Sequence, residues 1–161
     1  MSSSATSERV DPYRGFNFLI TLVDSSSSLG TSVTAIQSAP QGGFSECSGL
    51  EMALDIEEYK EGGNNGTVLH FPTRLKWTNL RLKRGLALSD DLWQWHYGFV
   101  QGQVQRRDGL ITLQDEDHNP VKAWSFTRGL PVRWLGPAFN ATQNQVAFEE
   151  IEIAHEGLQL Q

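Results

Sequence analysis

Apolar and polar residues alternate along residues 50–57 with a period of two, which is typical of a β-strand with one buried face. The apolar positions of this stretch are Leu50, Met52, Leu54 and Ile56, and the positions between them are Glu51, Ala53, Asp55 and Glu57. A second alternation over residues 16–23 puts Phe16, Phe18, Ile20 and Leu22 on one side. Both stretches are predicted strands, and we expect their apolar sides to cover a core.

Residues 74–84 also read as a strand, but the phase of their apolar positions changes partway along. Leu75 and Trp77 share one face, whereas Leu80 and Leu82 fall on the other. One extra residue would restore the register, so a β-bulge is predicted near Thr78 or Asn79.

The C-terminal half continues with short strands and turns. Asp108-Gly109 is a tight-turn signal between strands predicted at 103–107 and 110–114. A polar turn over 115–120 leads into a strand at 121–126, and a last strand with a phase slip is expected over 146–154.

One helix is predicted over residues 89–101. Ser89 is the expected N-cap, and Asp90 and Asp91 favour the positive first turn. Residues at helical spacing form its expected buried stripe, namely Leu92, Trp95, His96, Phe99 and Val100.

About seven strands and one helix predict a mostly β protein, an antiparallel β-sandwich or barrel with one packed α-helix. At 161 residues the chain is expected to hold one domain. We expect a flexible tail over residues 1–10 and a single domain over residues 11–161. Within this domain, residues 24–41 are rich in serine and are predicted to form an extended loop.

Composition narrows the classes of function. A net charge of −6 argues against a nucleic-acid surface. The single cysteine, Cys47, excludes an internal disulfide and is interpreted as a small core residue. The N-terminus lacks the features of a signal peptide, and no apolar run reaches the roughly 20 residues that span a bilayer. We therefore expect a soluble protein made in the cytoplasm, without direct membrane insertion.

The motifs that would indicate a metal site or a catalytic site are incomplete. Asp115, Asp117 and Asn119 match the first positions of a calcium loop, but Pro120 and Phe126 stand where glycine and glutamate are required. An Asx-type turn is the better interpretation. The four histidines lack zinc-site spacing, and no nucleophile elbow is present. We expect no catalytic, cofactor or metal site.

The glycine-rich stretch that runs from Glu58 to Thr67, EYKEGGNNGT, suggests at first a phosphate-binding loop. A phosphate loop needs its lysine after the last glycine, whereas Lys60 precedes the glycines and strands flank the stretch. A ligand loop is therefore the weaker interpretation.

Charge is segregated between two predicted strands. Residues 51–61 carry five acids against one base, and residues 74–84 carry five bases and no acid. These charges either pair across strands within one subunit or face the complementary strand of a neighbouring copy. Both readings remain open at this point.

Several short motifs, in this order and spacing, resemble the inner tube proteins of contractile tails. These proteins include phage tail tubes, the tubes of extracellular contractile injection systems and, more distantly, the Hcp proteins of type VI secretion. The motifs cover almost the whole chain after Asp11 and are FNF at 16–18, GFSECSGL at 43–50, EYKEG at 58–62, LKRG at 82–85, the helix around Trp93–Trp95, Trp124, Pro131, PAFNA at 137–141 and NQVAFEEI at 144–151.

The resemblance implies a structural subunit without catalysis. Six-subunit rings would stack into a hollow tube inside a sheath, and the strands would continue into a ring-shaped β-barrel. It also implies partners, namely further copies of the chain, a sheath protein, baseplate, spike and tube-terminating proteins, and effector cargo in the lumen. Such a particle is assembled in the bacterial cytoplasm. The 24–41 loop is longer than the turn typical of the family.

The resemblance further assigns residues 58–72 to an extended loop that contacts neighbouring subunits. We expect interface or stacking roles for Glu58, Tyr59, Lys60, Glu61, Gly62, Gly63, Asn64, Asn65 and Gly66, with the bases Arg81, Lys83 and Arg84 facing a neighbour. The alternation over 50–57 suggests that Glu51, Asp55 and Glu57 line the lumen.

The alternative is a monomeric β-sandwich module that binds carbohydrate or another ligand, because five tryptophans can form a stacking platform. Against it, Trp93 and Trp95 lie on the predicted helix, and Trp77 and Trp124 alternate like core residues. A glycosidase-like enzyme would need two carboxylates that converge in a cleft, and nothing in the sequence selects such a pair.

Overall fold

The computed structural model describes residues 14–15, 17–25, 41–63, 66–86, 89–142 and 144–161. The predicted tail at 1–10 and nearly all of the predicted loop at 24–41 lie outside these residues. Among the described residues, no helix is long and apolar enough to cross a membrane.

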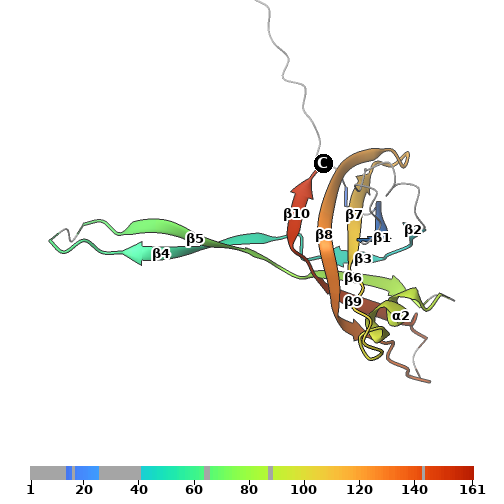
Figure 1. Ribbon diagram of the computed structural model, residues 1–161. Helices are drawn as coiled ribbons and strands as arrows, with labels where there is room; N and C mark the ends of the chain where they lie inside the picture. The colour runs from blue at the N-terminus through green and yellow to red at the C-terminus, as the bar shows by residue number, and fades with distance from the viewer. Residues whose placement is uncertain (1–13, 16, 26–40, 64–65, 87–88, 143) are drawn as a thin grey trace, which may run out of the picture.

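The body of the subunit is an eight-stranded antiparallel sheet that folds over on itself (Figure 1). The strand order is β2-β1-β7-β8-β9-β6-β3, and β10 also pairs with β8. The strands are β1 (Phe18–Asp24), β2 (Gln41–Gly42), β3 (Glu46–Ser48), β6 (Leu80–Gly85), β7 (Arg107–Gln114), β8 (Pro120–Leu135), β9 (Phe148–Ala154) and β10 (Gly157–Leu160).

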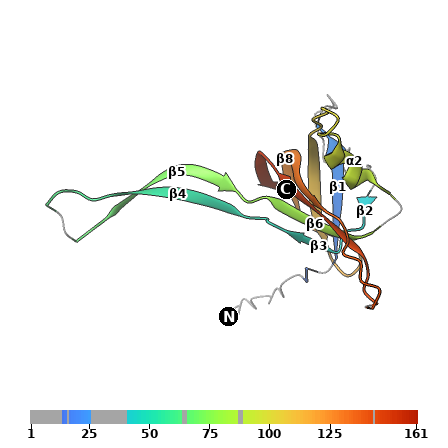
Figure 2. The same ribbon diagram turned by 90° about the horizontal axis from the view of Figure 1, so that it is seen from below.

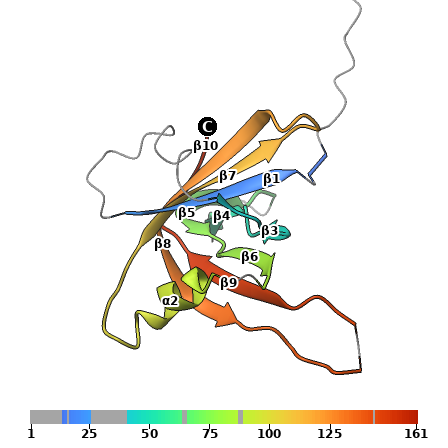
Figure 3. The ribbon, with the colours of Figure 1, turned by 90° about the vertical axis from the view of Figure 1, so that its right-hand side faces the viewer.

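The long strand β8 joins the two halves of the sheet. Its first half pairs with β7 on one side and β10 on the other, and its second half pairs with β9. The strand changes direction at Arg128, whose φ is +53°, and its register with β9 shifts between Pro131 and Arg133. In Figure 3, β1 and β7 form one layer and β6 and β9 the other.

The core lies between these layers and is closed by the helix α2 (Asp91–Tyr97). It comprises Ile20, Ile111 and Phe126 from one layer, Leu80, Leu82, Ile151 and Ile153 from the other, and Leu92 and Trp95 from α2. The predicted fold class, an antiparallel β-structure with one packed helix, is confirmed.

The predicted turn at Asp108-Gly109 is wrong, because both residues lie inside β7. A Cβ on residue 109 would approach the ring of Phe126 to 2.3 Å. Glycine is therefore present so that an aromatic ring of the neighbouring strand can lie against the backbone, and not to make a turn.

The helix is shorter than predicted, since α2 ends at Tyr97 and turns continue to Gly102. Asp90 occupies the N-cap position without a side-chain cap, while the Ser89 hydroxyl donates to the Asp91 carboxylate at 2.5 Å. Leu92 and Trp95 are buried, but Val100 is exposed. Only the first part of the predicted apolar stripe is therefore buried.

The predicted strand at 74–84 is two strands. β5 (Leu69–Trp77) pairs with β4 (Met52–Tyr59), whereas β6 lies in the body. The phase change at Thr78 and Asn79 is the place where the chain leaves one sheet for another. The bulge lies elsewhere, where Asp55 pairs with Arg74 and Ile56 pairs with Pro72.

Candidate assembly surface

The β4–β5 hairpin projects from the body as a long two-stranded ribbon, and it does so in both perpendicular views (Figures 1 and 2). The two strands pair with each other and with no other described strand. Their pairing is antiparallel from Met52 opposite Trp77 to Tyr59 opposite Leu69. Among the described residues, no strand pairs with the outer edges of this ribbon, and most of its side chains are exposed on both faces.

Apolar side chains cover much of the ribbon and are exposed. On one face, Met52, Leu54 and Ile56 are 69%, 54% and 55% exposed, and Leu75 lies opposite Leu54. On the other face, the rings of Tyr59 and Phe71 meet edge to face at 6.4 Å and both stay largely exposed. The expectation that the apolar face of residues 50–57 covers the core of the same subunit is wrong for β4.

Exposed apolar area on this scale marks an interaction surface, because a water-facing patch of this kind is costly in a monomer. A two-stranded ribbon is also only marginally stable by itself. The residues of β4 alternate between apolar and polar as strands do, and β4 and β5 satisfy each other's backbone groups along their shared edge. No described strand of the body covers the ribbon.

The charges of the ribbon are partly matched inside it. Asp55 and Lys76 pair at 2.7 Å across the strands, which confirms the intrasubunit reading for this pair. The acids Glu57, Glu58 and Glu61 are exposed toward the tip, together with Lys60. An ion pair this exposed contributes at most about 1 kcal/mol, so the charges direct association more than they stabilise the ribbon.

The tip of the ribbon carries the glycines of the predicted loop. Gly62 and Gly63 form a turn, and Gly63 has φ of +101°, a backbone conformation that favours glycine. Asn64 and Asn65 lie outside the described residues. The predicted loop at 58–72 is thus mostly strand, and its loop part begins only after Tyr59.

Three predicted interface bases lie in β6 and not on the ribbon. Arg81 is 3.8 Å from Glu152 and Lys83 is 3.8 Å from Glu46, and both bases keep substantial exposure. Glu152 belongs to β9 and Glu46 belongs to β3. The sequence suggested that these bases pair with the acids of residues 51–61, but within the subunit they lie near other acids.

Arg84, in contrast, is buried, with only 6% of its surface exposed. It contacts Glu149 of β9 at 2.6 Å and Asp91 of α2 at 2.6 Å, and it also donates to the backbone carbonyl of Ser89. Trp134 Nε1 donates to the other oxygen of Glu149 at 3.1 Å. The subunit itself therefore accounts for the charge of Arg84.

Glu149 also explains the phase slip predicted for the last strand. Its side chain points inward with Ile151 and Ile153, whereas Phe148 is partly exposed. The sequence predicts that a carboxylate points outward, and this expectation produced the apparent slip. Because Glu149 points inward, buried and less buried positions alternate without interruption along β9, and the predicted phase slip is wrong.

The pKa values of this cluster follow from burial and pairing. Burial opposes the charge of Arg84, but hydrogen bonds to Asp91 and Glu149 outweigh it and raise the pKa of the guanidinium. Burial likewise opposes the ionised form of Asp91, yet its bonds with Arg84 and Ser89 lower the pKa of that carboxyl.

The other candidate chemical groups are structural. The Asp115 carboxylate accepts from the backbone amides of Asp117 and Asn119 at 2.9 and 2.8 Å, which confirms the Asx-type turn and lowers the pKa of Asp115. Cys47 packs against the core, and burial raises the pKa of its thiol to about 11. The described residues include no group of three or more potential metal ligands.

The tryptophans of α2 and β8 do not form an open platform. Trp93 is 39% exposed, but it stacks on Tyr97 at 5.4 Å and meets Trp134 edge to face at 4.7 Å. Trp95 is buried, and its indole nitrogen donates to the carbonyl of Gln105 at 2.9 Å. Trp93 and Trp134 are therefore partners for each other, and Trp95 belongs to the core.

Comparisons with known proteins give one family. The family model described as T4-like virus tail tube protein gp19 matches residues 14–159, whereas no curated protein matches the sequence.

Solved structures share the fold. A chain from the anti-feeding prophage (AFP) baseplate has a TM-score of 0.81 at 24% identity, covering 95% of this chain and 97% of that one. A chain from the PVC sheath-tube complex of an extracellular contractile injection system has a TM-score of 0.77 at 23% identity, covering 99% of both chains. Hcp1 from Flavobacterium johnsoniae is more distant, with a TM-score of 0.50 at 14% identity and coverage of 88% and 94%.

Proposed function

Because this chain belongs to the T4-like virus tail tube protein gp19 family, we propose that its β4–β5 hairpin is the arm that joins one tube subunit to the next. The resemblance to contractile-tail tube proteins is confirmed by the family match over residues 14–159. The chain is therefore a tube subunit of a phage tail or contractile injection system, a structural role.

The observation that carries the proposal is the exposed apolar ribbon. Met52, Leu54 and Ile56 on one face and Tyr59 and Phe71 on the other are more than half exposed in the described part of the subunit. Contacts on two faces and two edges require more than one neighbour. A tube of repeated copies supplies such neighbours, because each copy presents its arm to one surface and receives another arm elsewhere.

In the proposed assembly, six copies close into a ring and the rings stack into a hollow tube. The edge strand β3 and the ribbon edges pair with strands of neighbouring copies, which removes exposed edges around the ring. The tip residues Glu58–Glu61, Gly62, Gly63 and Gly66, with Asn64 and Asn65, lie at the contacts between copies. The role is structural and involves no catalysis.

Arg81 and Lys83 belong to the proposed contact surface, because their ion pairs are long and exposed and leave both bases able to bind acids of a neighbour. Arg84 is not included, since it is buried in the subunit. Glu51, Asp55 and Glu57 stay candidates for the lumen wall, but the exposed apolar face of β4 removes the original reason for placing them there.

Sheath, baseplate, spike and tube-terminating proteins are the further proposed partners, and effector cargo is the proposed content of the lumen. The structures with this fold come from baseplate, cap and sheath-tube assemblies. Their folds support a tube subunit that meets such components at its outer wall and at the tube ends.

Replacing apolar arm residues by threonine tests the proposal. In Leu54→Thr/Ile56→Thr the β-propensity of β4 is kept and the apolar area is reduced. Burial of such side chains contributes about 1.5–3 kcal/mol each, so the concentration needed for tube formation should rise at least about tenfold. Sedimentation and electron microscopy measure this threshold.

The matched control is Val100→Thr/Val104→Thr, because these two valines are 73% and 64% exposed and lie outside the arm. The control should assemble as the parent does, and both variants should unfold at nearly the parent temperature. Equal assembly of the arm variant and the control would refute the arm.

A further inference from the structure

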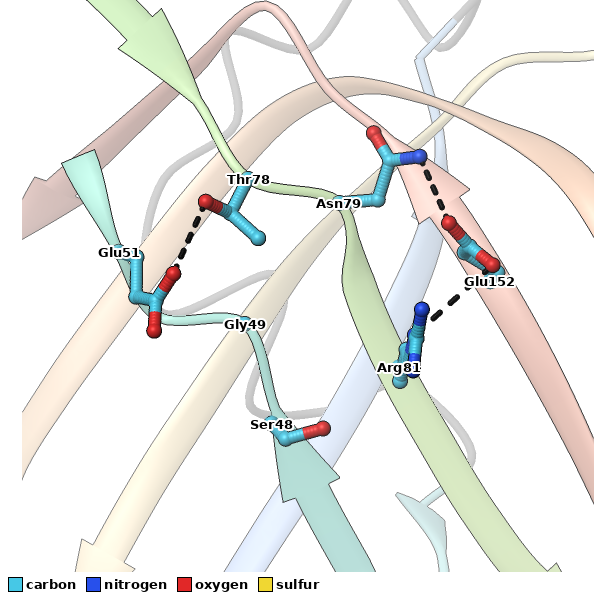
Figure 4. A pocket seen from close by; sticks show the side chains of 7 residues that line it. All are labelled: Ser48, Gly49, Glu51, Thr78, Asn79, Arg81 and Glu152. Atoms are coloured by element: carbon cyan, nitrogen blue, oxygen red, sulfur yellow. Dashed lines mark hydrogen bonds and ion pairs between the residues drawn. The ribbon is translucent and has the colours of Figure 1, made fainter. Parts of the chain in front are cut away.

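The arm meets the body at two short connections, because within the described structure β4 and β5 pair only with each other. The chain enters β4 through Gly49, Leu50 and Glu51 and returns to the body through Thr78 and Asn79. Figure 4 shows these two connections side by side, where they line an open polar hollow of about 360 Å³ with Arg81 and Glu152.

The two connections approach each other at Gly49. Its φ is +91°, and a Cβ at this position would lie 2.1 Å from the carbonyl oxygen of Asn79. That distance is a steric overlap with backbone atoms, which cannot move aside as a flexible side chain does. Any other residue at 49 must push the incoming and outgoing connections apart.

Hydrogen bonds tie the same two connections together. Between the connections, the Thr78 amide donates to the Glu51 carbonyl at 3.3 Å, and within the incoming connection the Glu51 amide donates to the Gly49 carbonyl at 2.8 Å. The Thr78 hydroxyl also donates to the Glu51 carboxylate at 3.1 Å (Figure 4). The root of the ribbon therefore holds both strands at a fixed separation.

A second set of bonds ties the root to the body. The Asn79 side chain donates to the Glu152 carboxylate of β9 at 2.8 Å. His155 Nε2 lies 3.1 Å from the Thr78 carbonyl and donates to it, since a carbonyl only accepts. The His155 ring also lies between the rings of Trp77 and Phe126, with centroid distances of 5.9 and 6.1 Å.

The Nδ1 atom of His155 is buried without a hydrogen-bond partner within the described structure. Leaving a buried polar atom unpaired has a cost of about 1–3 kcal/mol. The ring nevertheless stays in this position, where it links the last residue of β5 to the core.

We infer that Gly49, Glu51, Thr78, Asn79 and His155 form a joint that fixes the direction of the arm, and that this fixed direction is required for assembly. The inference rests on the proposed function of the arm. Association is weakened when a binding element must first be ordered, so an arm held in one direction loses less entropy on docking. The joint residues act by positioning the arm and need not touch the neighbour.

The central test is Gly49→Ala, with Gly102→Ala as its control. Gly102 also has a positive φ, +76°, but a Cβ there would meet no atom within 4 Å. Both variants place alanine at a positive φ, and only Gly49→Ala brings a Cβ against the backbone of the joint. Gly49→Ala should raise the tube-forming concentration at least about tenfold over Gly102→Ala.

A distance measurement reports the arm direction in the unassembled subunit. Spin labels at Glu61→Cys in the arm and Lys122→Cys on β8, in a Cys47→Ser background, give the distribution of arm-to-body distances. We expect one narrow population in the parent and in Gly102→Ala. The distribution should shift or broaden in Gly49→Ala.

Thr78→Val/Asn79→Ala provides a second route if Gly49→Ala does not fold. It removes the bonds to Glu51 and Glu152, and its control Thr73→Val removes the hydroxyl bond to the Asp55 carbonyl inside the ribbon. Thr78→Val/Asn79→Ala should broaden the distribution of arm-to-body distances and weaken assembly, whereas Thr73→Val should do neither. An unchanged distribution in the joint variants, or a changed one with parental assembly, overturns the inference.

These outcomes are separate from a failure of the proposed function. If Leu54→Thr/Ile56→Thr assembles normally while the joint variants still redirect the arm, the arm is not the connecting element. In that case the joint still sets arm direction, but the link to assembly is lost.

Discussion

Arg84 is the residue at which β6, β9 and α2 are held together. Its guanidinium bridges Glu149 and Asp91, both at 2.6 Å, in a site where only 6% of the residue is exposed. A buried ion pair of this kind gives limited net stability when compared with apolar residues, but the loss of Glu149 leaves the guanidinium with Asp91 as its one remaining carboxylate partner.

Glu149→Ala should therefore lower the free energy of unfolding by about 1.5–3 kcal/mol, since Arg84 keeps Asp91 as a partner, measured by urea denaturation of the unassembled subunit. Glu150→Ala, the outward neighbour on β9, should cost less than about 1 kcal/mol. The double variant Arg84→Met/Glu149→Leu should be much less destabilised than Glu149→Ala. Equal losses in Glu149→Ala and Glu150→Ala would show that the buried pair is unimportant.

At the scale of elements, β4 and β5 pair as ordinary antiparallel strands, but their hairpin projects away from the body (Figure 1). Its two strands satisfy each other's backbone groups along their shared edge. No described strand of the body pairs with them. The arm and the body are therefore expected to respond separately to mutation.

Deletion of residues 62–66 should leave the folded body intact, because the deleted tip lies beyond both arm strands. We expect an unfolding temperature within a few degrees of the parent, and a loss of stacking seen by electron microscopy. A serine-rich replacement of equal length separates the effect of length from that of residue identity. Long tubes formed by the shortened chain would exclude the tip from the contacts.

At the scale of the whole molecule, association has to overcome charge. The subunit carries a net charge of −6, so identical copies repel one another at long range. Local complementarity between exposed bases and acids can offset this repulsion, and its contribution falls as salt increases.

Arg81→Glu compared with Lys122→Glu tests this local complementarity at equal net charge. Both side chains are exposed bases, but only Arg81 belongs to the proposed contact surface. Arg81→Glu should weaken assembly at low salt and recover in part near about 1 M salt, where the Debye length is about 3 Å. Light scattering across a salt series measures this, and identical behaviour of the two variants would remove Arg81 from the interface.

Local periodicity determined most of the strands and the fold class. The alternation over residues 50–57 predicts β4, and the apolar spacing after Asp91 predicts α2, because side-chain direction repeats within each element. The tail-tube resemblance, carried by motifs such as GFSECSGL at 43–50 and EYKEG at 58–62, depends on order and spacing that are also present in the sequence.

Only the tertiary structure decided which apolar faces are buried. The side chains of β4 alternate like those of β9, yet Ile151 and Ile153 are buried while Leu54 and Ile56 are exposed. The difference arises because β9 pairs with β6 and β8 inside the body, whereas β5 is the one described strand that pairs with β4. Periodicity fixes which residues share a face, but burial of that face depends on contacts between segments far apart in the chain.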